Sequence, residues 1–427
     1  MSSSPALASA PRARPVDAGE RLVLLDVLRG FALGGVFLAN AYVHMSRRAL
    51  LPRTGPPPLE DSHADAVASF LFDQLVSGKA MSLFSFLFGL GFALQMLRAE
   101  QRGVSIVPLY SRRLTVLLLV GLTHLFAFWH GDILSMYALN GFVLLLLRRL
   151  PDRRLLGWSF VLLFLAPIAV FAVMRFIPPL LASPEGVVSA GQARLASLMQ
   201  LNRRTFDAFL SGDYPTTARA NAAYYLRAVL NTTWLTYLLG VLGRFILGLV
   251  AGRRRLFEDV PRHLSFFRRL LGWGLVLAVL GHGSDYLFGQ LARAGTLAGT
   301  PLKVWLYFQQ SLWEVGVVGL GAVYLAGLTL LFQRPRGQRV LSVLAPAGRM
   351  ALTNYLAQTA INQGLYYGYG LGLLGQVGPA ACLLLMTALF AVQVLVSHLW
   401  LARFRFGPAE WVWRCLTYGE LQPLRRV

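Results

Sequence analysis

The sequence predicts an all-α fold, a polytopic integral membrane helical bundle with about ten transmembrane helices. Hydrophobic residues make up 56% of the 427-residue chain and charged residues only 14%, whereas soluble domains carry roughly 25% charged residues. Apolar stretches of about 20 residues recur along the chain, and a helix of that length crosses a hydrocarbon layer of ~30 Å. Lipid offers no hydrogen-bond partner for backbone N–H and C=O groups, so each such stretch is expected to be helical.

Ten apolar windows define the expected spans. They lie near 24–44, 78–97, 114–130, 132–147, 155–177, 225–250, 270–291, 305–332, 351–373 and 377–402. The third window ends at His130 and the fourth begins after Gly131, which predicts a tight hairpin at His130-Gly131. The stretch 60–77 is amphipathic and is expected to lie in the membrane interface.

A single bundle is expected over 21–405, because the sequence shows no internal repeat and no second domain. Residues 1–20, rich in Ser, Ala and Pro, are predicted to form a disordered cytoplasmic tail. The longest polar insertion, near 178–224, is predicted to be extracytoplasmic. Residues 406–427 are predicted to form a cytoplasmic C-terminal segment.

Basic residues predict the orientation of the chain. Of 40 Lys and Arg residues, 26 lie in one alternating set of loops, 11 lie in the other set and three lie within spans. The richer set includes both termini, so the positive-inside rule places both in the cytoplasm of a multi-pass protein of the inner (plasma) membrane. This distribution explains the net charge of +21 without nucleic acid, which is not an expected partner. Two cysteines, Cys382 and Cys415, predict no disulfide framework.

The first span carries charges at membrane depth, where ionisable groups are costly unless paired. Asp26 and Arg29 are three residues apart, which places them side by side on a helix near its cytoplasmic end. They are either a structural ion pair, or Arg29 together with Arg21 faces a cytoplasmic ligand that carries phosphate. Asn40, near the outer end of the same helix, requires a polar partner such as an interhelical hydrogen bond.

Histidines and acids gather around the predicted hairpin at His124, His130 and Asp132. Asp132 can orient an imidazole and raise its basicity, as a general base requires; hydrogen-bonded turn residues are the alternative. A second group, His282, Asp285 and Glu314, is expected at similar depth and predicts a polar cavity that opens outward. No His-x3-His pair occurs, and no metal is expected.

Two motifs are expected at the cytoplasmic face. Thr353, Asn354 and Gln358 open the ninth span and are too polar to face lipid. In the C-terminal segment, Pro408 suits the first position of a helix and Glu410 suits its first turn. The aromatic residues around them indicate either an interfacial belt or a surface packed against the cytoplasmic mouth of the bundle.

On these motifs the chain resembles the YeiB-like family of bacterial membrane proteins, and the resemblance covers almost the whole chain. The motifs are Leu25-Asp26-x-x-Arg29-Gly30 with Asn40; Phe86-Leu87-Phe88-Gly89-x-Gly91; His124 with Gly131-Asp132-Ile133-Leu134-x-x-Tyr137-Ala138; Gly348-Arg349-Met350-x-Leu352-Thr353-Asn354-Tyr355; and Gly407-Pro408-x-Glu410-Trp411-x-Trp413-Arg414.

The opening Arg21-x4-Asp26-x2-Arg29-Gly30 also resembles the first helix of transmembrane acyltransferases, including heparan-α-glucosaminide N-acetyltransferase and the sugar O-acyltransferases. The resemblance implies that acyl-CoA enters from the cytoplasm and meets an acceptor, often a sugar, through the bundle. The first helix of the glucosaminide enzyme ends in an Asn, matched here by Asn40, and its catalytic His follows in the next outer loop. Here Leu51 falls at that offset, while His44 and His63 lie in the same loop.

These observations predict an acyltransferase that moves an acyl group from cytoplasmic acyl-CoA to an extracytoplasmic or lipid-linked hydroxyl or amine. The partners expected are membrane lipid, a small-molecule or glycan acceptor and a second copy of the chain in a homo-oligomer. A transporter or lipid-handling protein without covalent chemistry, or a scaffold, is the alternative. The residues expected to act are the base candidates His63, His44, and His130 with Asp132; Asn40 at the carbonyl oxygen; and Arg21, Arg29, Arg349 and Arg414 at the donor phosphates.

Overall fold

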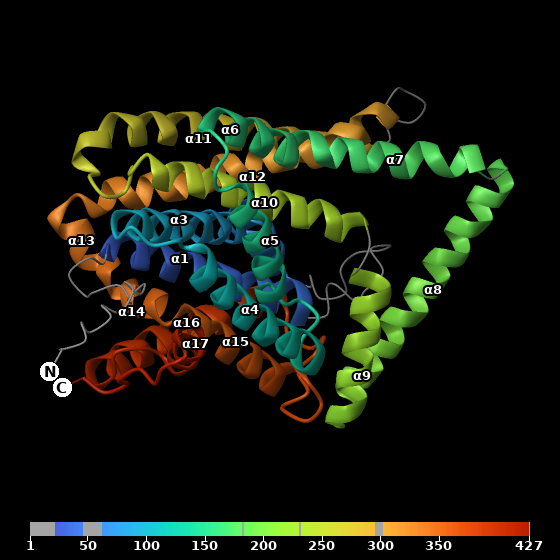
Figure 1. The fold of residues 1–427 in the computed structure, drawn as a ribbon. Coiled ribbons are helices and arrows are strands. Elements are labelled where there is room, and N and C mark those ends of the chain that lie inside the picture. Colours follow the sequence, from blue (N-terminus) through green and yellow to red (C-terminus); the bar gives the residue numbers. More distant parts are fainter. Residues whose placement is uncertain (1–21, 46–61, 182, 230–231, 295–301, 427) are drawn as a thin grey trace, which may run out of the picture.

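The computed structural model describes residues 22–45, 62–181, 183–229, 232–294 and 302–426. Within these ranges all regular structure is helical, apart from one isolated bridge between Phe404 and Arg425. Among the described residues, eight helical stretches are long and apolar enough to cross a membrane, and α5 is a shorter apolar helix. The structure therefore confirms the predicted all-α polytopic membrane bundle (Figure 1).

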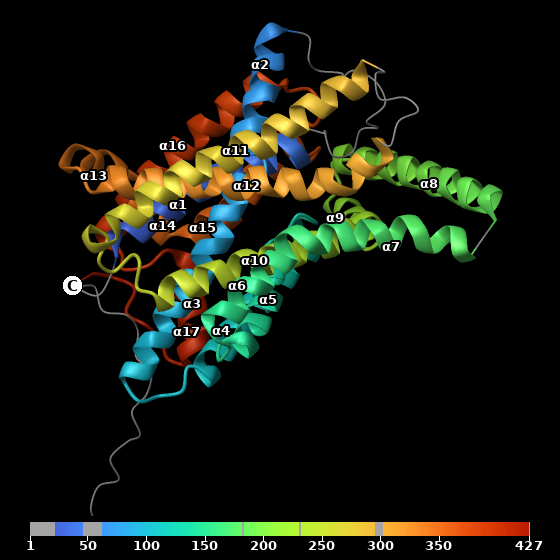
Figure 2. The ribbon, with the colours of Figure 1, turned by 90° about the horizontal axis from the view of Figure 1, so that it is seen from above.

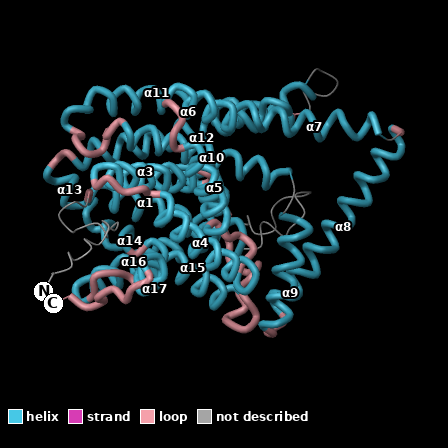
Figure 3. Tube along the Cα trace, viewed as in Figure 1, coloured by secondary structure: helices cyan, strands magenta, loops and turns pink. Residues whose placement is uncertain are grey.

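The described α-helices, in chain order, are α1 (Val23–Asn40), α2 (His63–Leu71), α3 (Lys79–Gln101), α4 (Val107–Thr123), α5 (Leu134–Leu147), α6 (Asp152–Phe160), α7 (Ala166–Leu181), α8 (Pro184–Leu210), α9 (Tyr214–Tyr224), α10 (Thr232–Arg253), α11 (Leu264–Arg293), α12 (Leu302–Phe332), α13 (Pro335–Leu341), α14 (Ala345–Arg349), α15 (Ala351–Tyr366), α16 (Pro379–Arg403) and α17 (Pro408–Tyr418). Each of the ten expected spans falls on one of these helices or on a consecutive pair. Most of the connections drawn as loops are short (Figure 3).

The amphipathic stretch 60–77 does not form a separate element on the surface. Its described part, α2 and the turn that follows it, continues into α3, and His63–Gln101 is one apolar helical stretch of 39 residues. The break at Gly78 has a positive φ of 77°. A Cβ at that position would also collide with the Trp313 ring, so the bend requires glycine.

Five π-helical turns interrupt or extend the helices in the described ranges. They are η2 (Ala41–Met45), η3 (Phe72–Val76), η4 (His124–Phe128), η5 (Val161–Leu165) and η6 (Tyr225–Val229). A π turn loosens the backbone hydrogen-bond pattern, and side chains of other helices donate to its carbonyls. The Tyr324 hydroxyl donates to the carbonyl of Leu75 at 2.7 Å, and the Gln363 amide donates to that of Phe128 at 2.6 Å. In an apolar medium such bonds tie one helix to another.

Glycines allow the closest helix contacts. A Cβ on Gly348 would collide with the carbonyl of Asp26, so α14 lies directly against α1. A Cβ on Gly89 would meet the backbone of Phe245, which brings α3 against α10, and Gly281 meets Gly316 between α11 and α12. Small residues at such crossings are typical of membrane bundles, because they let backbones approach.

The two ends of the helical bundle are formed by different helices. The helices α13, α14 and α17 gather at one end (left in Figure 1), which we call the arginine-rich end, while α8 and α9 lie at the other. The insertion near 178–224 thus forms two helices, and α7 and α8 project together from the bundle (Figure 2).

Candidate functional site

A cavity of about 350 Å³ lies among α1, α3, α4, α5, α14, α15 and α17 at the arginine-rich end. Its charged lining consists of six described arginines, with two acidic residues, and we call it the six-arginine cavity. The arginines are Arg29, Arg98, Arg102, Arg113, Arg349 and Arg414, and the acids are Asp26 and Glu410. The cavity reaches the surface at Arg102, which is exposed. Such an excess of guanidinium groups favours an anionic ligand.

Asp26 and Arg29 form the ion pair that their spacing predicts. Arg29 Nη1 lies 3.0 Å from Asp26 Oδ1; the Asp26 side chain is buried, whereas that of Arg29 is 30% exposed. A Cβ on Gly91 would lie 3.5 Å from the guanidinium, so this glycine of α3 leaves room for Arg29 at the cavity wall. The two sequence interpretations are therefore compatible: the pair neutralises Asp26 and still presents Arg29 to the cavity.

The C-terminal helix α17 forms a wall of the cavity, as expected if its aromatic residues pack against the mouth of the bundle. The Arg113 guanidinium lies 4.1 Å above the Trp413 ring, and Trp413 Nε1 donates to the Arg113 carbonyl at 3.0 Å. Arg414 lies 4.3 Å from the ring of Phe406 and 5.6 Å from that of Tyr418. Stacking on aromatic faces orients both guanidinium groups.

Glu410 joins α17 to the start of α15. Its carboxylate accepts hydrogen bonds from the N–H groups of Leu352 at 2.7 Å and Thr353 at 3.1 Å, and from the Thr353 hydroxyl. The same hydroxyl accepts from the N–H of Ala409 at 3.0 Å. Burial raises the pKa of Glu410 above its ordinary value, although these hydrogen bonds oppose the shift. Arg349 donates to the carbonyl of Arg405 at 3.4 Å, which completes this junction.

Tyr137, Tyr355 and Ile133 line the inner end of the cavity. The hydroxyls of Tyr137 and Ser85 share a hydrogen bond of 2.7 Å, and the Tyr355 hydroxyl accepts from the N–H of Ile133 at 3.2 Å. The ring centroid of His124 lies only 5.3 Å from that of Tyr355. A histidine thus lies one side chain beyond the cavity wall.

His124 and Asp132 form a buried pair. His124 Nδ1 lies 2.9 Å from Asp132 Oδ1, and His124 Nε2 lies 2.9 Å from the hydroxyl of Thr359. Asp132 Oδ2 also accepts from the N–H of Ser135 at 2.7 Å, at the start of α5. The carboxylate therefore orients one imidazole and caps a helix.

This pairing differs from the predicted support of His130 by Asp132. The π turn η4 ends α4, and the chain reverses before α5 begins at Leu134, so Asp132 returns beside His124. The backbone N–H and ring Nδ1 of His130 instead lie 2.6 Å and 3.1 Å from Asn221 Oδ1. Asn221 Nδ2 donates in turn to the Leu125 carbonyl at 2.7 Å, which fastens α9 onto the hairpin.

Of the remaining predicted residues, Asn40 and His63 are not among those that line the cavity. Asn40 is partly buried at the last residue of α1, about 16 Å along the helix axis from Arg29. His63 is exposed at the first residue of α2. His44 lies in η2, but its side chain is outside what the structure describes, and Arg21 precedes the described residues.

The sequence indicated the cytoplasmic arginine clusters as phosphate-binding groups but did not single out Arg98, Arg102 and Arg113, which line the cavity. In the structure Arg98 lies near the end of α3 and Arg113 lies in α4, so these residues of the predicted loop 98–113 belong to helices. No sequence signal joins His124 to Thr359, because these residues are 235 positions apart.

A second group of charges lies away from the cavity, and we call Lys79, Arg244 and Glu314 the buried ionic centre. Arg244 donates to Glu314 and, at 2.9 Å, to the Ser82 hydroxyl. Lys79, fully buried, donates to the carbonyl of Asp73 at 2.6 Å. Of the residues predicted to line an outward-opening cavity, Glu314 is paired with Arg244, and Asp285 accepts from the Gln309 amide at 3.1 Å.

Comparison with known proteins places these features in a wider group. The family described as "Protein of unknown function (DUF418)" matches residues 251–420. The uncharacterised protein YxaH of Bacillus subtilis (strain 168) is 34% identical over 97% of this chain and 98% of its own length. An uncharacterised 39.9 kDa protein from the amylase 3′ region of Bacillus acidopullulyticus is 29% identical over 96% and 97%. The uncharacterised protein YeiB of Escherichia coli (strain K12) is 29% identical over 95% and 98%.

Proposed function

The chain belongs to the YeiB-like DUF418 family of membrane proteins, and we propose that it is an acyltransferase that uses a cytoplasmic acyl-CoA and an extracytoplasmic or lipid-linked acceptor. The observation that supports this proposal is that a residue lining the six-arginine cavity, Tyr355, lies next to the His124–Asp132 pair. A polyanionic donor suits the arginines, and a buried His–carboxylate pair suits proton transfer. The proposal also orients the protein in the inner membrane with its arginine-rich end and both termini in the cytoplasm.

The donor would bind through its phosphates. Arg29, Arg349 and Arg414 approach the cavity from α1, α14 and α17, so one ligand could contact all three elements. The aromatic rings that hold Arg113 and Arg414 offer flat surfaces to a nucleotide base. The acyl end would point toward Tyr137 and the other uncharged groups at the inner end of the cavity.

His124 is the general base in this proposal, in place of His44, His63 and His130. If Nδ1–H donates to Asp132, then Nε2 carries no proton and accepts a hydrogen bond from the Thr359 hydroxyl. The same nitrogen can instead accept a hydrogen bond from the hydroxyl or amine of the acyl-acceptor substrate. Nε2 takes a proton from the acceptor hydroxyl or amine, whose oxygen or nitrogen attacks the thioester carbon. The C–S bond then breaks and the coenzyme A thiolate takes up a proton. Asp132 stabilises the imidazolium that forms.

Tyr355 lines the cavity, and its ring centroid lies 5.3 Å from that of His124. Its hydroxyl accepts from the N–H of Ile133 and can donate its own proton, so it suits the developing charge on the carbonyl oxygen. Asn40, at the far end of α1, would serve the acceptor rather than the carbonyl.

The first experiment is calorimetric titration of the detergent-purified full chain with acetyl-CoA and with a long-chain acyl-CoA. We expect saturable binding that the double variant Asp26→Asn/Arg29→Ala weakens, since it removes the cavity guanidinium without leaving a buried carboxylate charge. The matched control is Arg336→Ala, on the exposed side of α13 at the same end. Absence of thioester binding by folded protein would refute the transferase proposal and favour a transporter or lipid-handling protein.

A further inference from the structure

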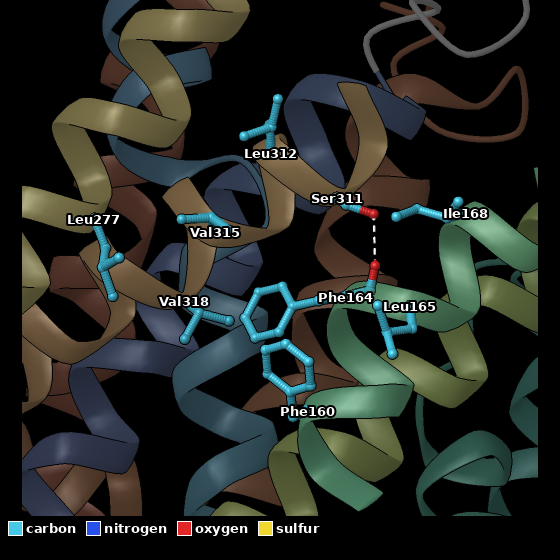
Figure 4. A pocket seen from close by; sticks show the side chains of 9 residues that line it. All are labelled: Phe160, Phe164, Leu165, Ile168, Leu277, Ser311, Leu312, Val315 and Val318. Atoms are coloured by element: carbon cyan, nitrogen blue, oxygen red, sulfur yellow. Dashed lines mark hydrogen bonds between the residues drawn. The ribbon is translucent and has the colours of Figure 1, made fainter. Parts of the chain in front are cut away.

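A second cavity lies far from the arginines, on the side of the bundle formed by η5, α7, α11 and α12. Its volume is about 740 Å³ (Figure 4). The helix α12 packs against η5 and α7 and also against α11. It therefore forms the floor of a groove whose walls are η5 with α7 and α11. The ring of Phe164 points toward Val318, and the ring of Phe160 packs against it with the two centroids 5.4 Å apart (Figure 4). Leu277 comes from α11.

The lining of this groove is hydrocarbon. Ser311 supplies the one side-chain polar group among its described lining residues, and the Ser311 hydroxyl donates to the carbonyl of Phe164 at 2.7 Å. That bond to a carbonyl of the π turn η5 supplies the hydroxyl with a partner, as an apolar medium requires. The groove therefore presents aliphatic and aromatic carbon to its occupant.

Its position in the chain gives the depth of the groove in the membrane. All its walls belong to candidate spans, Asp152–Met174, Pro261–Leu291 and Gln309–Phe332. Leu312 stands near the beginning of α12's span, at the end remote from the arginines, and Val318 lies six residues deeper, roughly 9 Å along the helix. Phe160 is 56% exposed to the medium around the protein, which at this depth is lipid rather than water.

We propose that this groove holds one acyl chain of a membrane lipid from the leaflet opposite the arginine-rich end. The chain runs from the side of Ile168 and Leu312 toward Phe160 and Val318, with its methyl end near the middle of the membrane. Hydrocarbon is the occupant that matches both the lining and the depth. This site is separate from the six-arginine cavity and does not depend on the proposed transferase activity.

Photolabelling of the full chain in phospholipid nanodiscs tests the proposal. Two phospholipid probes carry a diazirine in one acyl chain, close to the ester in the first and close to the terminal methyl in the second. After illumination, labelled peptides are identified by mass spectrometry. We expect the first probe to label the surroundings of Ile168 and Leu312, and the second to label those of Phe160 and Val318.

Filling the groove should remove this labelling. Val315→Trp and Leu277→Trp fill it from α12 and from α11, and Leu277 is 38% exposed, so its variant can fold even if the first cannot. We expect at least a fivefold loss of groove labelling in each folded variant and none in the control Leu395→Trp, on an exposed face of α16. The proposal would be overturned if labelling were proportional to the exposed area of each helix and were the same in the unmodified protein and in the two groove variants. If the probe with the diazirine near the ester labelled the surroundings of Phe160 and Val318 instead, the lipid would come from the opposite leaflet and that part of the proposal would be wrong.

Discussion

The six-arginine cavity and the buried ionic centre both place guanidinium groups inside the helical bundle, but they use them differently. In the buried ionic centre, Arg244 donates to Glu314 and to the Ser82 hydroxyl. In the cavity, six arginines face two acids and one of those acids, Glu410, serves backbone N–H groups. The first arrangement joins helices, whereas the second keeps positive charge available for a ligand.

The largest effect should come from breaking the buried pair. Glu314→Leu leaves the Arg244 charge without its carboxylate in a low-dielectric core, and we expect it to lower the free energy of unfolding by about 3–5 kcal/mol. Arg244→Leu/Glu314→Leu should recover most of that loss. Thermal unfolding in detergent measures both. Arg254→Leu, which breaks a surface pair with Asp152 (3.1 Å), is the control and should change little. Equal losses in the single and double variants would contradict the pairing.

The next largest effect is expected on the rate of acyl transfer, without a change in donor affinity. Asp132→Asn keeps the shape of the site but removes the charge that supports the His124 imidazolium, so acyl transfer should fall on the order of 10²–10⁴-fold. Donor affinity should stay unchanged, because Asp132 is not among the residues that line the six-arginine cavity. Turnover and calorimetry of the same preparation separate the two quantities. If His130→Ala reduced turnover as strongly while His124→Ala did not, the base would be His130.

A smaller effect is expected for single cavity arginines. Arg349→Ala or Arg414→Ala should weaken acyl-CoA binding by roughly tenfold, the range of one charge-assisted hydrogen bond. Binding to the unmodified protein should weaken as salt is added. Calorimetry at two salt concentrations tests this, with Arg336→Ala as the matched control. A salt-independent affinity would exclude phosphate recognition by this cavity.

The smallest effect is a dependence of stability on pH. The folded pKa of Glu410 is raised by burial, so above the ordinary carboxyl pKa the folded state binds more protons than the unfolded state. Glu410 therefore favours folding most at low pH, and its contribution declines as pH rises through the folded pKa. Melting temperatures between pH 5 and pH 8 should fall more steeply for the unmodified protein than for Glu410→Gln. Parallel curves would show that Glu410 does not titrate in this way.

The fold could be predicted from the sequence because hydropathy and helix spacing are local signals. The spans and the Asp26–Arg29 pair both follow from residues close in the chain. The site depends on longer relations: Trp413 meets Arg113 across 300 positions, and His124 finds Asp132 only because η4 turns the chain. Spacing along one helix shows which side chains are neighbours there, but it does not show which helices meet.

The π turns have a consequence for how such a protein can change over evolution. Each adds a residue to a helix, and η2, η3, η4 and η6 lie in the half remote from the arginine-rich end. Deleting one residue there would rotate the segment beyond it by about 100°, while the cavity half kept its register. Insertions and deletions of single residues thus offer a route by which one end of the bundle could acquire new specificity and the other could keep its ligand.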